Sequence, residues 1–284
     1  MKKNNFLRSL SMSKGFFMFS LLLASCERPE LPGQVSGNLE VSITSIQQRA
    51  SSRVSDGVPF SRICFAVYDS LGTRVKQINQ NADDKHFGTV GFNLPAGKYQ
   101  VVVVGHSSSG NPTMTNPSKI QFKNGNGFTD TYLYNDRVEL SGERVKLAAE
   151  VRGIATLCHF VVTDTVPAGV TQMQFQYKGG SSAFDANTGL GCVGSTQTET
   201  FPVEQGSSSV GFDLYTFLPV AESKLHIEAK ACDANANVVI DRQFDVPVRQ
   251  YAATNVSSAY FSGLSTLDIV IDTDTPWGGI DFFD

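Results

Sequence analysis

The residues whose types and spacing most clearly indicate a chemical modification lie near the start of the chain, where Leu21–Ser25 (LLLAS) precedes Cys26. Four basic residues and an apolar run, Gly15–Leu23, come before this cysteine. A basic segment, an apolar segment and small residues at a cleavage point are typical of a secretory signal. Only a thiol can carry a thioether-linked diacylglycerol, so the pattern predicts cleavage after Ser25 and lipidation of Cys26.

A membrane-spanning anchor is the alternative for this segment. The apolar run of nine residues is well short of the roughly 20 that cross a bilayer. We therefore expect a lipoprotein signal peptide at 1–25, a polar tether at 26–36 and attachment to the bacterial outer membrane through lipid. Two or more acyl chains hold a protein stably, whereas one binds only marginally.

The charge balance excludes one class of partner. Residues 1–25 hold four of the 23 Lys and Arg and none of the 27 Asp and Glu. The processed chain then carries 19 basic against 27 acidic residues, a net charge of −8. Nucleic-acid binding depends on basic clusters that neutralise phosphates. We therefore expect no nucleic-acid partner.

Other residues that could do chemistry are scattered along the chain. The serine-rich run Gly105–Gly110 lacks the G-x-S-x-G spacing of a nucleophile elbow. The acidic C-terminus lacks the glycine and final glutamate of an EF-hand loop. The histidines form no H-E-x-x-H motif and no close pair. We expect no enzyme, no cofactor and no metal site. The four histidines are His86, His106, His159 and His226.

Four cysteines follow Cys26. Cys64 is alone in the first half, so at most one disulfide can close among Cys158, Cys192 and Cys232. An even cysteine count in an exported protein favours disulfides. Buried free thiols are our preferred interpretation, and a disulfide within the second half stays open.

The remaining sequence predicts strands throughout. Leu39, Val41 and Ile43 alternate with polar residues, which is the period-two pattern of a half-buried strand. Val101–Val104 is predicted to be central and covered on both faces. A long exposed loop is expected at 107–127, with at most a short strand around Ile120–Phe122, and a Gly/Ser/Asn/Thr-rich loop is expected at 179–197. No stretch has sustained helical periodicity. Further strands are expected at 63–67, 87–94, 145–151, 154–162, 172–177, 209–218, 224–231, 238–246, 257–261 and 267–271.

The two halves also share a short motif. Val90–Leu94 (VGFNL) has a counterpart in Val210–Leu214 (VGFDL). A chance match is the alternative to a tandem repeat. Short strands separated by Gly and Pro turns favour all-β sandwiches, so we expect domains at 37–144 and 145–284.

Several segments, in this order, resemble the FimB-like (Mfa-type) fimbrial lipoproteins. They are the segment before Cys26, Phe65–Asp69, Leu94–Tyr99 and Gln174–Gly180. The resemblance covers nearly the whole chain through loose strand-and-turn patterns. It implies two tandem transthyretin-like (Ig-like) β-sandwich domains and a fimbrial anchor or accessory subunit at the cell surface. Other fimbrial subunits would be its partners through strand exchange.

The same resemblance bears on one loop. Stalk members of this family are cleaved after an arginine in the loop that follows their first strand, whereas anchor members stay uncut and lipidated. Arg49 and Arg53 lie in such a loop. We expect both to be ordinary loop residues.

A second interpretation is a surface lipoprotein whose loops bind a glycan or a host ligand. A planar row of exposed aromatic rings would favour it, because sugars stack on such rings. The chain has a single Trp, Trp277, close to the C-terminus. This composition favours the structural role.

The C-terminus is unusually apolar. Leu267, Ile269 and Ile271 alternate along a predicted strand, and the last eight residues contain Trp277, Phe282 and Phe283. Burying one such side chain is worth roughly 1.5–3 kcal/mol, so we expect the segment to dock. Its own second domain and a neighbouring subunit are the two alternatives, and all six residues are candidate subunit contacts.

Two short motifs suggest modification. Asp69-Ser70-Leu71 and Asp164-Thr165-Val166 match an Asp-Ser/Thr-apolar glycosylation acceptor. Such motifs also arise by chance, so unmodified turns are the alternative. Ser70 and Thr165 are the candidate acceptors.

The signal predicts a clear effect of one substitution. Cys26→Ser removes the thiol that would carry lipid, and we expect the variant to leave the membrane fraction. Metabolic lipid labelling and intact mass of the mature protein measure this. A variant that stays membrane-bound to the same extent as the parent contradicts lipidation of Cys26.

Overall fold

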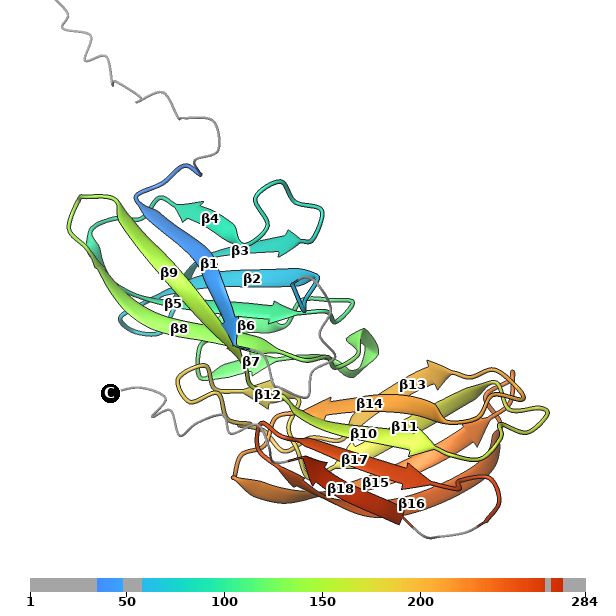
Figure 1. Ribbon diagram of the computed structural model, residues 1–284. Helices are drawn as coiled ribbons and strands as arrows, with labels where there is room; N and C mark the ends of the chain where they lie inside the picture. Colours follow the sequence, from blue (N-terminus) through green and yellow to red (C-terminus); the bar gives the residue numbers. More distant parts are fainter. Residues whose placement is uncertain (1–34, 48–57, 264–266, 273–284) are drawn as a thin grey trace, which may run out of the picture. The chain divides into compact units, whose positions relative to one another are not determined.

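The computed structural model describes residues 35–47, 58–263 and 267–272. Their regular structure consists of β-strands and one 3-10 turn, η1 (Asn124–Asn126), with no α-helix among them (Figure 1). The all-β class predicted from the sequence is confirmed. Predictions on residues 1–34 and on Arg49, Arg53, Trp277, Phe282 and Phe283 lie outside the described residues.

Nine strands build the first half of the described chain. Seven of them form one sheet in the order β3-β2-β5-β8-β9-β1-β4. The nine are β1 (Leu39–Gln47), β2 (Arg62–Asp69), β3 (Arg74–Asn81), β4 (Thr89–Phe92), β5 (Gly97–His106), β6 (Thr113–Asn116), β7 (Lys119–Gln121), β8 (Tyr132–Leu140) and β9 (Val145–Gly153).

The second half forms two four-stranded sheets, β14-β10-β17-β18 and β13-β11-β15-β16. A short ninth strand, β12, pairs with β7 of the first half. The strands are β10 (Thr156–Val162), β11 (Gln172–Lys178), β12 (Ala183–Phe184), β13 (Gln197–Pro202), β14 (Val210–Thr216), β15 (Glu222–Cys232), β16 (Val238–Arg249), β17 (Ala253–Ser258) and β18 (Leu267–Asp272).

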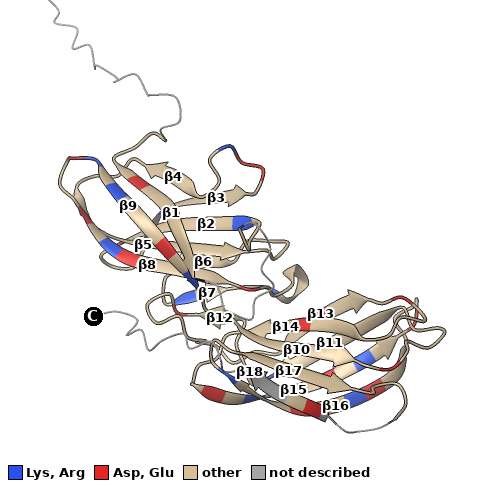
Figure 2. Ribbon diagram, viewed as in Figure 1, with Lys and Arg blue, Asp and Glu red and all other residues tan. Residues whose placement is uncertain are grey.

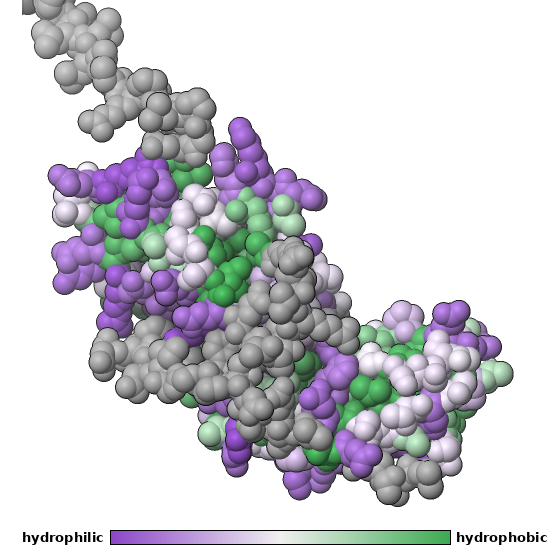
Figure 3. All heavy atoms as spheres, viewed as in Figure 1, coloured by the Kyte–Doolittle hydropathy of each residue, from purple (hydrophilic) through white to green (hydrophobic). Residues whose placement is uncertain are grey.

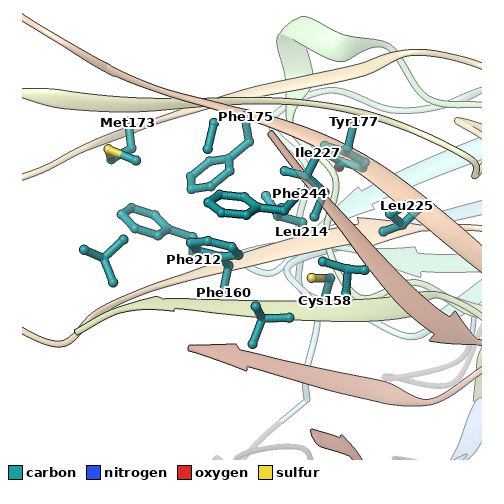
Figure 4. Packing of buried hydrophobic residues seen from close by; sticks show 14 of the residues in the cluster. Cys158, Phe160, Met173, Phe175, Tyr177, Phe212, Leu214, Leu225, Ile227 and Phe244 are labelled. Carbon is teal, nitrogen blue, oxygen red and sulfur yellow. The ribbon is translucent and has the colours of Figure 1, made fainter. Parts of the chain in front are cut away.

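The core of the second half lies between its two sheets. Phe160 and Phe212 come from one sheet, and Phe175 and Phe244 come from the other (Figure 4). The ring centroids of Phe175 and Phe212 are 5.0 Å apart, and those of Phe160 and Phe244 are 5.4 Å apart. Tilted aromatic pairs at such distances add stability beyond their buried area. The predicted β-sandwich architecture is confirmed here.

The strand order of the first half recurs in the second. β1 pairs with β4 antiparallel and with β9 parallel, and β10 pairs in the same way with β14 and β17. The row β3-β2-β5-β8 likewise corresponds to β13-β11-β15-β16. The two matching motifs form β4 and β14, at equivalent edges. The tandem repeat predicted from this match is therefore confirmed by the topology, and β18 is an addition to the second copy.

Several sequence-based boundaries differ from the structure. β9 belongs to the first sheet because it pairs with β1 along its length, so the sheets change after Gly153 and not at residue 145. The strands β3, β8 and β13 and the short strands β6 and β12 were not predicted. β3 and β13 are edge strands with mainly polar sequences, RVKQINQN and QTETFP, and β8 (YLYNDRVEL) has polar residues at its centre. Alternation of apolar residues cannot reveal such strands.

Parts of the predicted loops 107–127 and 179–197 are folded onto the first sheet, although many residues of 107–127 are exposed as expected. Met114, Ile120 and Phe122 of the first loop and Phe184 of the second are buried. They pack with Phe217 against the face of the sheet that carries Val102 and Val104. The opposite face, with Val101 and Val103, holds a separate core. The valine strand is thus covered on both faces, as predicted.

The beginning of the described chain is tied to the first sheet. The Arg144 guanidinium donates to the Val35 carbonyl at 2.7 Å and to the Glu40 carboxylate at 2.5 Å. Lys146 Nζ lies 3.3 Å from the same carboxylate. The Asn38 side chain exchanges two hydrogen bonds with the backbone of Leu94.

The cysteines agree with the preferred interpretation in most respects. Cys64, Cys158, Cys192 and Cys232 are all free thiols, so the second half holds no disulfide among these residues. Three are buried, as predicted for inert thiols. Cys192 is exposed, which corrects the expectation for that residue.

Met114, Ile120, Phe122, Phe184 and Phe217 form a buried cluster to which both halves contribute, called here the shared cluster. Substitution of Phe217 tests how much this cluster contributes to stability. The Phe217 ring lies 4.9 Å from Phe184 and 6.0 Å from Phe122, centroid to centroid. Phe217→Ala leaves a cavity there, and we expect a loss of about 3–5 kcal/mol in the free energy of unfolding. Denaturant unfolding measures it, with Val239→Ala, at a position 53% exposed, as the control. A loss no larger than that of the control contradicts the assignment.

Candidate functional site

The histidines predicted to be scattered do not combine into a catalytic centre. His159 Nδ1 lies 2.6 Å from Asp213, and His226 Nδ1 lies 2.9 Å from Asp245, both as cross-strand pairs. Within the described ranges, no three His, Cys, Asp or Glu side chains are placed to hold one metal ion. These pairs join neighbouring strands.

His106 and Cys64 form a buried pair in which a histidine could act as base toward a cysteine nucleophile. His106 Nε2 lies 3.7 Å from Cys64 Sγ. Burial, helped by the nearby Arg62, lowers the pKa of His106 to about 4, and burial raises the pKa of Cys64 to about 12. At neutral pH the imidazole is uncharged and the thiol keeps its proton. A thiolate is the reactive form, so this pair is inert.

An apolar groove beside β1 is the first candidate interaction site. β4 covers one edge of β1 only from Leu39 to Ser42, and the Ile43 N–H then donates to the Gly88 carbonyl at 2.8 Å. From Thr44 to Gln47 no described strand lies on that side. A hollow of about 330 Å³ opens there. Its lining is Ile43, Thr44, Ser45, Ile46, Val58, Phe60, Ile63, Phe87 and Gly88.

The lining of this groove contains no charged residue. Phe60 and Ile63 are buried at 4% and 1% exposure, whereas Val58 is 51% exposed. Ile46 and Phe87 are half-buried against the first core. A free strand edge offers unpaired N–H and C=O groups to another strand. The groove thus combines a backbone template with an apolar wall.

β9 and β18 also have open edges, as do the other strands that end a sheet. β8 pairs with β9 only at Gly153 and Arg152, so Val145–Val151 has no described strand on its side away from β1. β18 pairs with β17 alone and ends its sheet. In the second half β18 occupies the side of β17 that corresponds to this open side of β9.

The sequence-predicted contact residues are partly placed by the structure. Leu267, Ile269 and Ile271 all belong to the edge strand β18, as the alternation predicted. Ile269 is half-buried and packs against the core of its own second half, so part of this strand docks on its own chain. The groove residues were not predicted, because the open edge depends on where β4 begins.

The two candidate glycosylation residues are both exposed. Each follows an aspartate that stabilises a turn. Asp69 Oδ1 accepts from the N–H groups of Leu71 and Thr73, and Asp164 Oδ2 accepts from the N–H groups of Phe261 and Ser262. Modification of Ser70 and Thr165 stays a prediction.

The described part of the surface has no row of exposed aromatic rings on which sugars could stack. The exposed large apolar side chains among the described residues are all aliphatic. Acidic and basic residues are interspersed along the strands of both halves (Figure 2), and apolar atoms reach the surface between polar ones on the face in view (Figure 3). Parts of the loops 107–127 and 179–197 pack into the buried cluster on the first sheet. The row of exposed aromatic rings that would favour glycan binding by the loops is not found among the described residues. The exposed apolar side chains are Val58, Leu71, Val75, Val220, Val238 and Val239.

These features define a duplicated β-sandwich protein with open strand edges. No helix of the described chain is long and apolar enough to cross a bilayer. No protein-family model matches the sequence, and no curated protein matches it.

Solved structures are similar in fold. A candidate polysaccharide-binding protein from Bacteroides thetaiotaomicron matches with a TM-score of 0.51 and 11% identity, covering 82% of this chain and 95% of its own. A candidate adhesin from Bacteroides ovatus matches with a TM-score of 0.49 and 18% identity, over 75% and 83%. The fimbrial anchor protein Mfa2 from Porphyromonas gingivalis matches with a TM-score of 0.43 and 12% identity, over 82% and 96%. The first match shows a shared fold.

Titration of His106 predicts a pH-dependent stability. Its pKa is about 4 in the fold, against 6.5 for an exposed histidine, so the unfolded chain binds more protons between these values. Stability is therefore complete above pH 6.5 and falls as the pH drops to about 4, by at most about 3 kcal/mol. Chemical unfolding of the parent and of His106→Gln across this range measures the effect.

The difference in unfolding free energy between the parent and His106→Gln isolates the contribution of His106. Glu199 also makes stability depend on pH, but in the opposite direction. Burial raises the pKa of Glu199 from 4.5 to about 7, so its contribution to stability falls as the pH rises through that range. This contribution is common to both proteins. A parent-minus-variant difference that is flat from pH 6.5 to 4 contradicts the assignment to His106.

Proposed function

We propose that this chain is a non-catalytic subunit of a surface fimbria, an anchor or accessory protein held to the outer membrane by lipid on Cys26. The observation that carries the proposal is the uncovered edge of β1 at Thr44–Gln47, beside an apolar groove of about 330 Å³. The family resemblance in the sequence supports the same role. The partner would be another fimbrial subunit.

Sheet augmentation is the binding mode that this geometry favours. An added strand pairs its backbone with the free edge, and its alternate side chains enter the neighbouring pockets. Main-chain hydrogen bonds would supply affinity from Thr44 to Gln47. The groove lining is uncharged, so the incoming strand would present apolar residues at every second position. A charged side chain there would lose its hydration without gaining a partner.

The C-terminal edge supports a second contact of the same kind. β18 ends its sheet and lies at the opposite end of the sequence from β1. A subunit with one receptive edge near its start and another near its end can contact two neighbours. Head-to-tail contacts of this type generate open filaments when the rotation does not close. The six residues Leu267, Ile269, Ile271, Trp277, Phe282 and Phe283 are the proposed contacts at this end.

Ile46→Lys tests the groove. Ile46 lines it and is half-buried against the first core, so a lysine there places a charge where an apolar side chain of the partner would pack. We expect a loss of at least tenfold in the amount of partner subunit that copurifies with the protein from sheared fibres. Quantitative mass spectrometry of the sheared fraction measures this.

Val220→Lys provides the matched control, because Val220 is 54% exposed and lies outside the groove. Both variants must show the thermal unfolding and the membrane attachment of the parent. Unchanged copurification with Ile46→Lys excludes the groove as the partner site. Absence of any fimbrial subunit from material that copurifies with the parent contradicts the proposed function itself.

A further inference from the structure

A second hollow, of about 420 Å³, lies at the far end of the first sheet from the shared cluster. Lys98 and Gln100 alternate along β5 with the buried valines 102 and 104, so their side chains stand on the same face. Arg137 and Glu139 occupy that face on β8, with Leu133. Lys98 is directly opposite Glu139, and Gln100 is opposite Arg137.

An ordered chain of amides holds one wall of this hollow. Gln100 Nε2 donates to Asn135 Oδ1 and to Asn187 Oδ1, both at 2.8 Å. Asn187 is fixed in turn by Asp185 at 2.7 Å and by Ser118 at 3.3 Å. These contacts connect β5 and β8 to a loop of the second half. The side-chain amide oxygen of Gln100, Oε1, accepts no hydrogen bond from a described residue.

The charged groups at the hollow form only weak ion pairs with other described residues. Lys98 Nζ and the Glu139 carboxylate lie 3.9 Å apart, with side chains 75% and 68% exposed. Arg137 forms no ion pair with another described residue. Asp69, at the rim, is occupied by its own turn. The hollow therefore offers a guanidinium with no ion-pair partner among the described residues, an amide oxygen, and an ammonium and a carboxylate that are joined by one long, exposed ion pair.

We propose that this hollow binds a short oligosaccharide that contains a uronic acid. Each sugar hydroxyl both donates and accepts, so a wall of alternating donors and acceptors suits it. Glu139 and Gln100 would accept from hydroxyls, and Lys98 would donate to them. Arg137 would hold the sugar carboxylate through its planar pair of N–H groups.

The balance of charges at the hollow favours a sugar acid over ligands with a higher density of negative charge. Glu139 and Asp69 lie at the same hollow as Lys98 and Arg137, so the four charges sum to zero. A phosphate or a sulfate polymer would meet two carboxylates, whereas a sugar acid brings one charge among several neutral hydroxyls. The chain also carries a net charge of −4, so general electrostatic attraction does not account for binding of an acid.

Binding would depend on hydrogen bonds and one ion pair. Tyr99 also lines the hollow, but its side chain alternates to the other face of the sheet and packs against the first core. The hollow volume of about 420 Å³ is within the usual range for small-ligand sites. This site lies on a sheet face and not on the groove beside β1, so its failure leaves the fimbrial proposal untouched.

The test uses two matched probes, a trimer of galactose and the same trimer with one galacturonic acid in place of one galactose. Isothermal titration calorimetry of the purified protein should show tighter binding of the acidic trimer. Arg137→Ala should weaken it at least about tenfold, since a charge-assisted hydrogen bond is lost, with little effect on the neutral trimer. Glu139→Gln should weaken both trimers, because an amide accepts hydroxyl protons less strongly than a carboxylate.

Lys76→Ala is the control, because Lys76 is an exposed cation on β3 of the same sheet and does not line the hollow. It should bind both trimers as the parent does. Equal affinity of the parent for the two trimers, an undiminished affinity in Arg137→Ala, or no binding at millimolar concentration would overturn the proposal. Matching thermal unfolding of all variants excludes misfolding as the cause of a loss.

Discussion

The first sheet has two apolar faces, and the covering of its second face is the constraint on which the rest of the structure depends. Val102 and Val104 point away from the core that Val101 and Val103 occupy, and four such side chains cannot all face one layer. The chain covers the second face with segments drawn from both halves. The rings of Phe122 and Phe217 meet there at an interplanar angle of 30°. Segments that resemble free loops in the sequence are therefore core elements.

This constraint also explains which parts of the fold follow from the sequence. Met173, Phe175 and Tyr177 alternate with glutamines, and β11 buries those three residues. The four valines of β5 were correctly interpreted as a central strand. The polar edge strands β3 and β13 gave no such signal, and β17 begins four residues before its expected position. Its buried Thr254 is satisfied by a hydrogen bond to the Pro247 carbonyl, which apolar patterning cannot reveal.

The candidate sites were less accessible to sequence reasoning than the fold. The groove beside β1 exists because β4 begins only at Thr89, opposite Ser42, and the polar hollow exists because β5 and β8 align Gln100 with Arg137. Both depend on pairing between segments distant in the chain. The alternation in Leu267–Ile271 was local and was recognised. Sequence periodicity identifies which side of a strand is apolar, but not which strand edges remain uncovered.

The position of β1 has a mechanical consequence. Its first residues are hydrogen-bonded on both sides, to β4 and to β9, and the Arg144 contacts fix the backbone just before it at Val35. Tension that enters the fold through the preceding residues acts along the axis of β1. The bonds on both flanks are then loaded together in shear, and they cannot be opened one after another from an end. A pulling force applied from the N-terminal side therefore acts on a strand whose hydrogen bonds on both sides resist its extraction from the sheet.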